Sequence, residues 1–252
     1  MRLLFIGDVN GEDGVRFLAD NIEDIKKQYK INVVIVNGEN AAEGRGITQK
    51  IYKDFMKMGV NAITMGNHAF SNKEIDKLLE DDANIVVPAN YPTYYEKGYM
   101  TIKYNNETIT VINILGRVYM NLPLDCPFRT AKKIIDEVDS DYYIVDMHAE
   151  ATSEKIALGH YLDGIKGAIL GTHTHVQTAD ETILENGTFY ITDVGMTGPL
   201  DGIIGADRDL ITDRFLLGRP TRLVMHKGRM QLNGVVLDFD LKKITRISIK
   251  QS

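Results

Sequence analysis

Short apolar runs alternate with helical patterns along the first two thirds of the chain. The runs are continuously apolar, which is typical of parallel strands that are covered on both faces. The stretches between them place apolar side chains three or four positions apart, as on one face of an amphipathic helix. The expected strands are 3–6, 33–36, 62–65, 85–87, 142–147 and 168–170, and the expected helices are 15–29, 49–58, 72–79, 128–138 and 153–162. This order predicts an α/β fold with a largely parallel sheet.

The other segments have an antiparallel pattern. Residues 99–115 predict a hairpin with Asn105 and Asn106 at its turn, because asparagine tolerates a positive φ. From about Glu181 onward, turn signals at 185–188 and 225–228 separate β-rich runs. The apolar stretch Phe215-Leu216-Leu217 is expected to pack in the core of a second sheet, with a subunit contact as the alternative. Since no linker or repeat interrupts the pattern, we expect a single domain over residues 1–252.

Composition and charge narrow the classes of function. The 252 residues are 44% hydrophobic and 25% charged, which indicates a globular protein rather than a disordered one. Lys and Arg number 29 against 35 Asp and Glu, so the net charge is −6. This balance disfavours long nucleic acid and anionic membranes as partners, because both attract basic surfaces. A small anionic substrate stays compatible, since one local site can meet its charge.

The first residues and the cysteine content predict a location. The apolar start of the chain ends at Gly7, which is shorter than the about 7–15 apolar residues of a signal peptide. No later run approaches the roughly 20 apolar residues of a membrane span. The single cysteine, Cys126, excludes a disulfide framework and fits a reducing compartment. We therefore expect a cytoplasmic protein.

Residues that can bind metal ions follow five of the predicted strands. In chain order they are Asp8, Asn37-Gly38-Glu39-Asn40, Gly66-Asn67-His68, His148-Ala149-Glu150 and Gly171-Thr172-His173-Thr174-His175. Because the carboxyl ends of parallel strands meet at one edge, we expect these side chains to converge. Imidazole, carboxylate and amide ligands suit divalent Fe, Mn or Zn, and no thiolate is among them.

Each of these motifs also has a simpler explanation. Asp8 could cap a helix or close a turn, and Asn37-Gly38 is a common turn. The strongest motif is His173-Thr174-His175, because two such histidines are rarely needed for packing. In a strict strand their rings would point to opposite faces, so a loop or two adjacent ions is required. The coincidence of all five motifs favours a metal site.

Three further residues have open interpretations. His160 lies in a helical pattern and is expected to be packed or on the surface. His226 lies in a turn signal and is expected to be exposed to solvent. Asp193 ends another apolar run, and it either supports the site through a neighbouring side chain or is an ordinary turn carboxylate.

The order of these motifs resembles that of the calcineurin-like metallophosphoesterases. The longer strings Glu39–Thr48 and Thr192–Pro199 are similar to those of the bacterial YmdB family, and the resemblance spans nearly the whole chain. It implies a four-layer αββα sandwich that holds two divalent metal ions bridged by a carboxylate and a hydroxide. The metals it implies are Fe or Mn, with Zn as a further candidate.

The chain departs from the wider superfamily at two positions. Asp8-Val9-Asn10 lacks the histidine of the usual Asp-x-His motif, and Glu39 stands where a bridging Asp is usual. The resemblance implies that Asn40 takes the coordination place left by the missing histidine. It assigns Asp8, Glu39, Asn40 and His175 to one ion, and Glu39, Asn67, His148 and His173 to the other.

The resemblance also implies an activity. It points to hydrolysis of phosphodiesters, particularly 2′,3′-cyclic nucleotides such as 2′,3′-cAMP to the 3′-monophosphate. His68 is expected to be the general acid, because it is adjacent to Asn67 and is not itself assigned to a metal. Arg45 is a candidate for contact with the phosphate or the base, and a solvated arginine is the alternative. Two other functions stay open: a phosphomonoesterase or protein phosphatase on the same ions, and a regulatory protein that senses a nucleotide or RNA with little turnover. The expected partner is a small anionic nucleotide, and the family also suggests a homo-oligomer.

Overall fold

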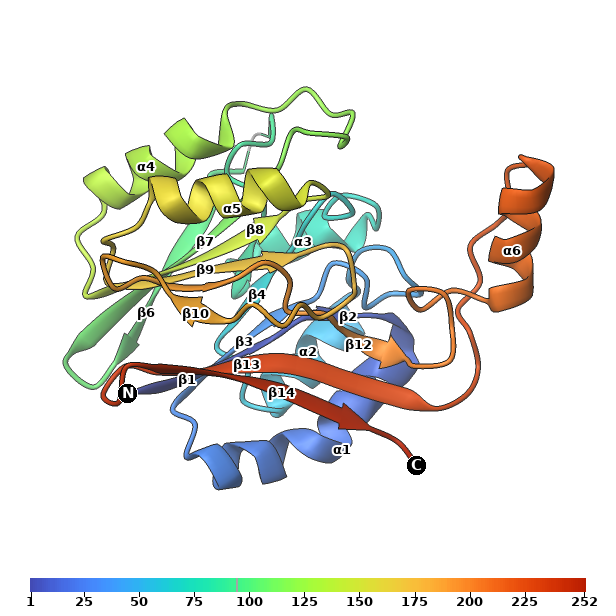
Figure 1. Ribbon diagram of the computed structural model, residues 1–252, viewed down its shortest axis with the longest axis horizontal. Coiled ribbons are helices and arrows are strands. Elements are labelled where there is room, and N and C mark those ends of the chain that lie inside the picture. Colours follow the sequence, from blue (N-terminus) through green and yellow to red (C-terminus); the bar gives the residue numbers. More distant parts are fainter. Residues whose placement is uncertain (94) are drawn as a thin grey trace.

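The computed structural model describes residues 1–93 and 95–252, and two β-sheets pack face to face within it (Figure 1). The first sheet has the order β2 (Asp8–Val9), β12 (Met196–Pro199), β13 (Met230–Asp238), β1 (Arg2–Ile6), β3 (Val33–Asn37), β4 (Ala62–Thr64) and β5 (Ile85–Val86), with β14 (Lys243–Lys250) paired to β13. The second has the order β10 (Thr182–Ile183), β11 (Phe189–Ile191), β9 (Gly167–Thr172), β8 (Tyr142–His148), β7 (Glu107–Leu115) and β6 (Tyr99–Tyr104).

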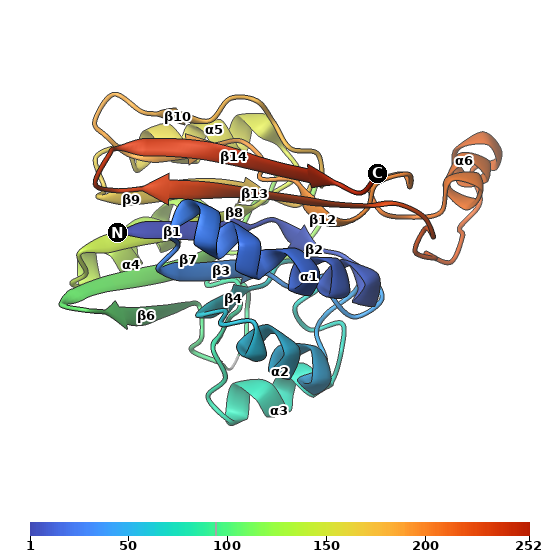
Figure 2. The same ribbon diagram turned by 90° about the horizontal axis from the view of Figure 1, so that it is seen from below.

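Helices cover the outer faces of both sheets. The first sheet is covered by α1 (Gly11–Tyr29), α2 (Gln49–Lys57) and α3 (Glu74–Glu80), and the second by α4 (Pro127–Glu137) and α5 (Thr152–Tyr161). The four-layer αββα sandwich is thereby confirmed. A sixth helix, α6 (Arg208–Leu217), projects from the sandwich in both views (Figures 1 and 2). Within the described ranges, no helix is long and apolar enough to cross a membrane.

The sandwich explains why its strands are apolar at every position. Along β1, Leu3 and Phe5 point into the layer between the two sheets, whereas Leu4 and Ile6 point toward the helices. All four side chains are fully buried. At about 25 cal/mol for each Å² of apolar surface removed from water, burial on both faces is the main term that holds the layers together.

The pairing of the strands confirms most of the sequence prediction. β1, β3, β4 and β5 are parallel in one sheet, and β7, β8, β9 and β11 are parallel in the other. β6 and β7 form the expected hairpin, and Asn105 has a φ of 53° at its turn. The C-terminal third is only partly antiparallel, because β11 pairs parallel to β9 and β12 parallel to β2.

The prediction for the stretch 215–217 is wrong. These residues end α6 instead of packing in a sheet, and Phe215 is 81% exposed. The helix is fixed at its ends, because the Asp207 side chain accepts from the N–H groups of Asp209 and Leu210 and Gly218 ends it in the left-handed conformation. Strong capping signals therefore decide the structure here, while the sequence suggested burial from hydrophobicity alone.

Two histidines outside the candidate site can now be placed. His160 is exposed on α5, which agrees with the surface position that was one of its two expected locations. His226 was expected in solvent, which is wrong: its side chain is only 13% exposed, with Nδ1 3.6 Å from Asp207 Oδ2. The cause is that the chain after α6 folds back, so that Met225 pairs with Ala206.

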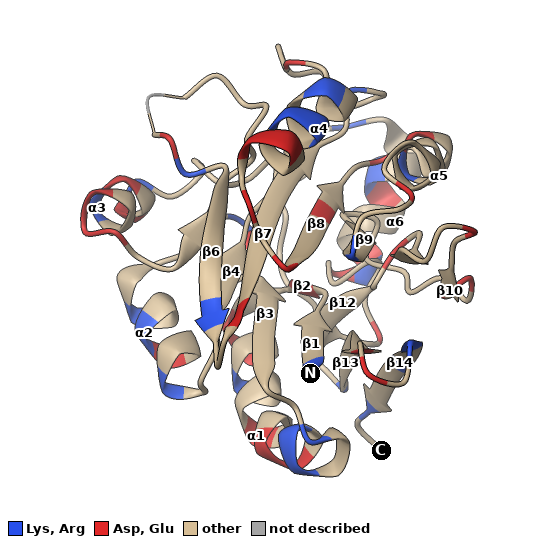
Figure 3. Cartoon of the chain, turned by 90° about the vertical axis from the view of Figure 1, so that its left-hand side faces the viewer, with Lys and Arg blue, Asp and Glu red and all other residues tan. Residues whose placement is uncertain are grey.

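Charged side chains of both signs share the helix surfaces. In Figure 3, Lys and Arg are mixed with Asp and Glu on α1 and α4. On α4 this mixing forms ion pairs one turn apart, such as Lys132 with Asp136. Such exposed pairs contribute only about 0.3–0.5 kcal/mol each.

Candidate metal centre

The predicted metal-binding residues lie where strands of both sheets end. Asp8, Glu39 and Asn67 follow β1, β3 and β4 of the first sheet. His148 and His173 stand at the ends of β8 and β9 of the second sheet. The expected convergence therefore occurs, with the correction that it joins the edges of two stacked sheets.

His148 is the centre of one group. Its Nε2 atom lies 3.1 Å from Glu39 Oε1, 3.0 Å from Asn67 Oδ1 and 3.1 Å from His173 Nδ1. On the other side of the ring, Nδ1 lies 2.9 Å from the hydroxyl of Thr172. That hydroxyl donates to Asp146 Oδ1 and so accepts from Nδ1, which places the lone pair of the neutral ring on Nε2.

The spacing of this group fits a bound cation. Two atoms that bind one ion at the right angle of octahedral coordination, each through a bond of about 2.1 Å, lie about 3.0 Å apart. The three contacts of His148 Nε2 have this length. Donor atoms of Glu39, His148 and His173 all lie within 4.8 Å of one another. A candidate metal site of histidine and glutamate is therefore present.

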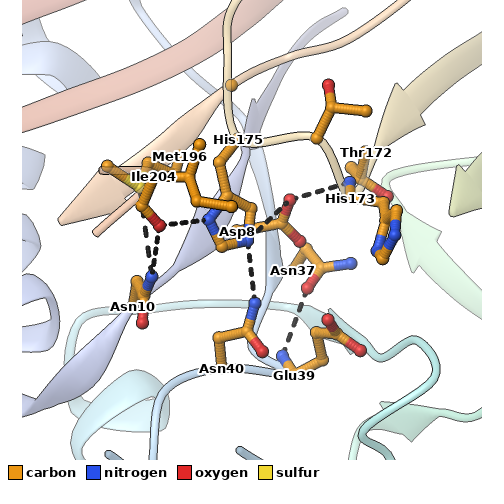
Figure 4. A network of polar contacts seen from close by, with 12 residues as sticks. Asp8, Asn10, Asn37, Glu39, Asn40, Thr172, His173, His175, Met196 and Ile204 are labelled. Carbon is orange, nitrogen blue, oxygen red and sulfur yellow. Dashed lines mark hydrogen bonds and ion pairs between the residues drawn. The ribbon is translucent and has the colours of Figure 1, made fainter. Parts of the chain in front are cut away.

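Asp8, Asn40 and His175 form a second group beside the first (Figure 4). His175 Nε2 lies 3.0 Å from Asn40 Nδ2 and 3.9 Å from Asp8 Oδ2, while its Nδ1 donates to the Ile204 carbonyl at 2.9 Å. Asp8 Oδ1 and Asn40 Oδ1 are buried and have no hydrogen-bond partner among residues 1–93 and 95–252. A buried oxygen without a donor is costly, and a cation would satisfy both of them.

The two histidines of the His-x-His motif are held by a loop. His173 has a φ of 98° and His175 a φ of 66°. The segment is therefore a loop, which is one of the two possibilities that the His-x-His motif allowed. Asp193 fixes this loop by accepting from the N–H of Thr174 at 3.1 Å and from its hydroxyl at 2.6 Å. The same carboxylate binds Lys155 Nζ at 2.7 Å, and both side chains are buried. Of the two interpretations of Asp193, the structure therefore supports the first: its carboxylate fixes the loop that holds the two histidines, and it is not an ordinary turn carboxylate.

The electrostatics of the site favour positive charge between its carboxylates. Burial lowers the pKa of His148, but Glu39, Asp8 and Asp146 outweigh it and raise that pKa to about 9. Burial raises the pKa of Glu39, but the charge and hydrogen bond of His148 bring it down to about 2. The pKa of Asp8 rises to about 6, mainly through burial. A bound cation would favour the ionised form of both carboxyl groups.

His68 and Arg45 lie at the rim of this centre. The backbone N–H of His68 donates to Glu39 Oε2 at 2.9 Å, which fixes the turn after β4. Its imidazole lines a cleft, and its pKa is lowered by burial and by the charge of Arg45, against the opposing effect of Glu39. The Arg45 side chain is exposed.

Two groups that orient the histidines were not recognised as such from the sequence: Glu150 stood only as part of a candidate motif, and Asp146 lay inside a predicted strand. Glu150 Oε2 lies 3.2 Å from His173 Nε2, opposite the ring atom that faces His148. Asp146 is fully buried on β8 and accepts from Asn37, Thr64 and Thr172. The sequence could have indicated both groups, because Asp146 and Glu150 each lie two residues from His148.

The chain forms a four-layer sandwich with histidine, amide and carboxylate groups at its strand ends. The fold agrees with that of a putative 5′-nucleotidase from Staphylococcus aureus, at a TM-score of 0.60 and 15% identity over 98% of this chain and 53% of that one. Much more similar are a hypothetical protein from Thermus thermophilus (TM-score 0.94, 42% identity, 100% of both chains) and a phosphatase from Mycoplasma pneumoniae (TM-score 0.92, 36% identity, 100% of this chain and 93% of that one).

The family follows from the sequence comparison. Residues 4–251 match the family model described as YmdB-like protein, and the chain belongs to this family. It is 49% identical over 252 residues to a Bacillus subtilis protein named 2′,3′-cyclic-nucleotide 2′-phosphodiesterase, covering 98% of this chain and 95% of that protein. Fold and family together make the chain an enzyme of the phosphoesterase class.

Proposed function

We propose that this protein is a dinuclear metal-dependent phosphodiesterase that hydrolyses 2′,3′-cyclic nucleotides. Asp8, Glu39, Asn40 and His175 would hold one ion, and Glu39, Asn67, His148 and His173 the other. The imidazole, amide and carboxylate donors suit Fe, Mn or Zn, and of these we expect Fe or Mn, with Zn as the further candidate. The observation that carries the proposal is the pair of adjoining donor groups, one around His148 Nε2 and one around Asp8 and Asn40, in a chain of the YmdB-like family.

The residues divide the work of the reaction. When bound, two ions would activate a water molecule and neutralise charge on the phosphate. Glu39 is suited to lie between the ions because its two oxygens face different ways: Oε1 toward His148 and Oε2 toward the His68 backbone. Thr172 and Ile204 hold His148 and His175 in the tautomer that turns Nε2 toward the centre.

His68 is proposed as the general acid. Attack of water on phosphorus breaks the bond to the ribose O2′, and that oxygen must take up a proton to leave. His68 lines the cleft beside Glu39 but makes none of the contacts around His148 Nε2, so its imidazole is free for this task. Proton donation of this kind contributes about 10²–10⁴-fold. The product is then the nucleoside 3′-monophosphate.

The name of the Bacillus relative supports the choice of substrate. A net charge of −6 is compatible with a small nucleotide, whose charge a local cation centre can meet. A cytoplasmic location and a homo-oligomer stay predictions from the sequence and the family.

The test is a product analysis with metal-loaded protein. We expect 2′,3′-cAMP to give 3′-AMP, and bis-p-nitrophenyl phosphate to be cleaved in preference to p-nitrophenyl phosphate. A preference for p-nitrophenyl phosphate would instead identify a monoesterase. Release of 2′-AMP would contradict the assigned leaving group.

A further inference from the structure

The cleft at the candidate metal centre has two chemically different sides. Its volume is about 350 Å³. One side is polar and consists of metal-centre residues and their neighbours, including His68, His173 and His175. The other side, which we call the arm wall, consists of Ile203, Ile204, Ile211, Phe215 and Leu223, with Arg214 beside them. A phosphate needs only the first side, so the arm wall requires another explanation.

The arm wall is fixed relative to the metal centre. The carbonyl of Ile204 accepts from His175 Nδ1 at 2.9 Å and from Asn10 Nδ2 at 3.5 Å (Figure 4). Ile203 and Ala206 exchange two backbone hydrogen bonds of 2.9 Å that close this turn. Ile204 has a φ of 46°, a conformation that is unfavourable for a β-branched residue and persists only where the surrounding structure fixes it. The Ile204 side chain is 54% exposed.

Three apolar residues of the arm wall, Ile204, Phe215 and Leu223, are open to a ligand. Phe215 is 81% exposed and Leu223 is 38% exposed. The arginines that pair with a carboxylate among residues 1–93 and 95–252 are Arg2, Arg16, Arg229 and Arg246, so Arg214 forms no ion pair there. A planar, largely apolar ring system with polar edges matches such a surface, because it stacks on an aromatic side chain and interacts with a guanidinium group.

The size of the cleft limits the ligand to a small molecule. Small-molecule sites have volumes of about 300–1,000 Å³, and this cleft lies near the lower end of that range. It therefore suits one nucleotide rather than an oligonucleotide.

We propose that the arm wall is the nucleoside subsite of the enzyme, with Phe215 stacking on the base of a mononucleotide whose phosphate lies at the metal centre. This inference rests on the proposed function and adds the group that distinguishes nucleotides from other phosphodiesters. Phe215 is a specificity residue here and takes no part in bond cleavage.

The experiment compares two cyclic phosphates that differ in the base. The ratio of kcat/KM for 2′,3′-cAMP to kcat/KM for glycerol 1,2-cyclic phosphate measures the contribution of the nucleoside. We expect Phe215→Ala to lower this ratio about tenfold through KM, the range expected for loss of one base–aromatic stack. Phe215→Tyr keeps the ring and should keep the ratio. Leu216→Ala is the matched control, since Leu216 is 76% exposed on the same helix but does not line the cleft.

The outcomes separate the two proposals. An unchanged ratio in Phe215→Ala, or an equal fall in Leu216→Ala, overturns the nucleoside subsite. If both alanine variants reduce the mass measured by light scattering while the ratio is constant, the arm wall is a subunit contact and the subsite is also overturned. If wild-type protein cleaves neither compound, the proposed function fails, and calorimetry with 3′-AMP then decides: about tenfold weaker binding to Phe215→Ala supports the subsite, and equal binding overturns it.

Discussion

The buried ion pair between Lys155 and Asp193 stabilises the loop that carries His173 and His175, because Asp193 also binds Thr174 in that loop. Replacing Lys155 with Met removes the ammonium group, whose Nζ atom lies 2.7 Å from Asp193 Oδ2. Lys155 is 1% exposed and Asp193 is fully buried, so water cannot replace the lost partner. Breaking such a pair costs about 3–5 kcal/mol.

The lower end of that range applies, because Asp193 keeps other donors. Thr174 donates to it twice, and the N–H of Gly195 donates at 2.8 Å. We therefore expect Lys155→Met to lower the free energy of unfolding by about 3 kcal/mol. For a chain of this size that corresponds to a fall in Tm of about 6–12 °C.

Thermal unfolding followed by circular dichroism measures this loss. The comparison is made with and without excess chelator, which separates the ion pair from any effect of bound metal on stability. Lys132→Met is the control, because its pair with Asp136 on α4 is exposed and should change stability by less than about 0.5 kcal/mol. A fall in Tm for Lys155→Met no larger than that of the control would refute the reasoning.

Three further predictions concern single side chains. His68→Ala should keep its metal content but lose about 10²–10⁴-fold in kcat on 2′,3′-cAMP, and much less on a substrate with a p-nitrophenolate leaving group. Equal losses on both substrates would argue against a general acid, and so would any loss in the exposed control His160→Ala. Glu150→Gln weakens the acceptor of His173 Nε2 and should lower metal affinity about tenfold in a chelator competition, whereas unchanged affinity would show that the contact is incidental. Burial raises the pKa of Asp163, but hydrogen bonds from the β10–β11 turn outweigh burial and lower that pKa. The ionised carboxylate therefore stabilises the folded protein above its unfolded pKa of about 3.9, and this stabilisation disappears as the pH falls through the lower folded pKa. Asp163→Asn should therefore melt below wild type at neutral pH and approach it in acid, and a constant difference would contradict this account.

The hydrophobic pattern predicted most of the sandwich because both faces of its central strands are covered. Runs such as 33–36 are apolar throughout, which distinguishes them from half-exposed strands. The candidate metal-binding residues were recognised for a related reason: polar groups such as Asn67 and His148 directly follow predicted strands, where packing does not require them.

Other features depend on tertiary structure that local patterns do not contain. For α6, hydrophobicity alone favoured burial of Phe215, because an apolar residue of the core and an apolar residue of an exposed surface look the same in sequence. Lys155 lies in a helical pattern where lysines usually face water, and only the position of Asp193 makes it a buried partner. Asp146 resembled an ordinary strand residue until Asn37, Thr64 and Thr172 were placed around it.

In the proposed enzyme, side chains that are far apart in the sequence and lie at the strand ends of both sheets bind two metal ions. Elemental analysis of anaerobically purified protein, reconstituted with Fe or Mn, tests this most directly. The account predicts about two ions per chain in wild type and in Glu43→Gln, whose carboxylate is exposed in the same loop, and loss of both ions in Glu39→Gln. Wild-type protein that holds no ions after reconstitution, or a Glu39→Gln variant that keeps both, would contradict it.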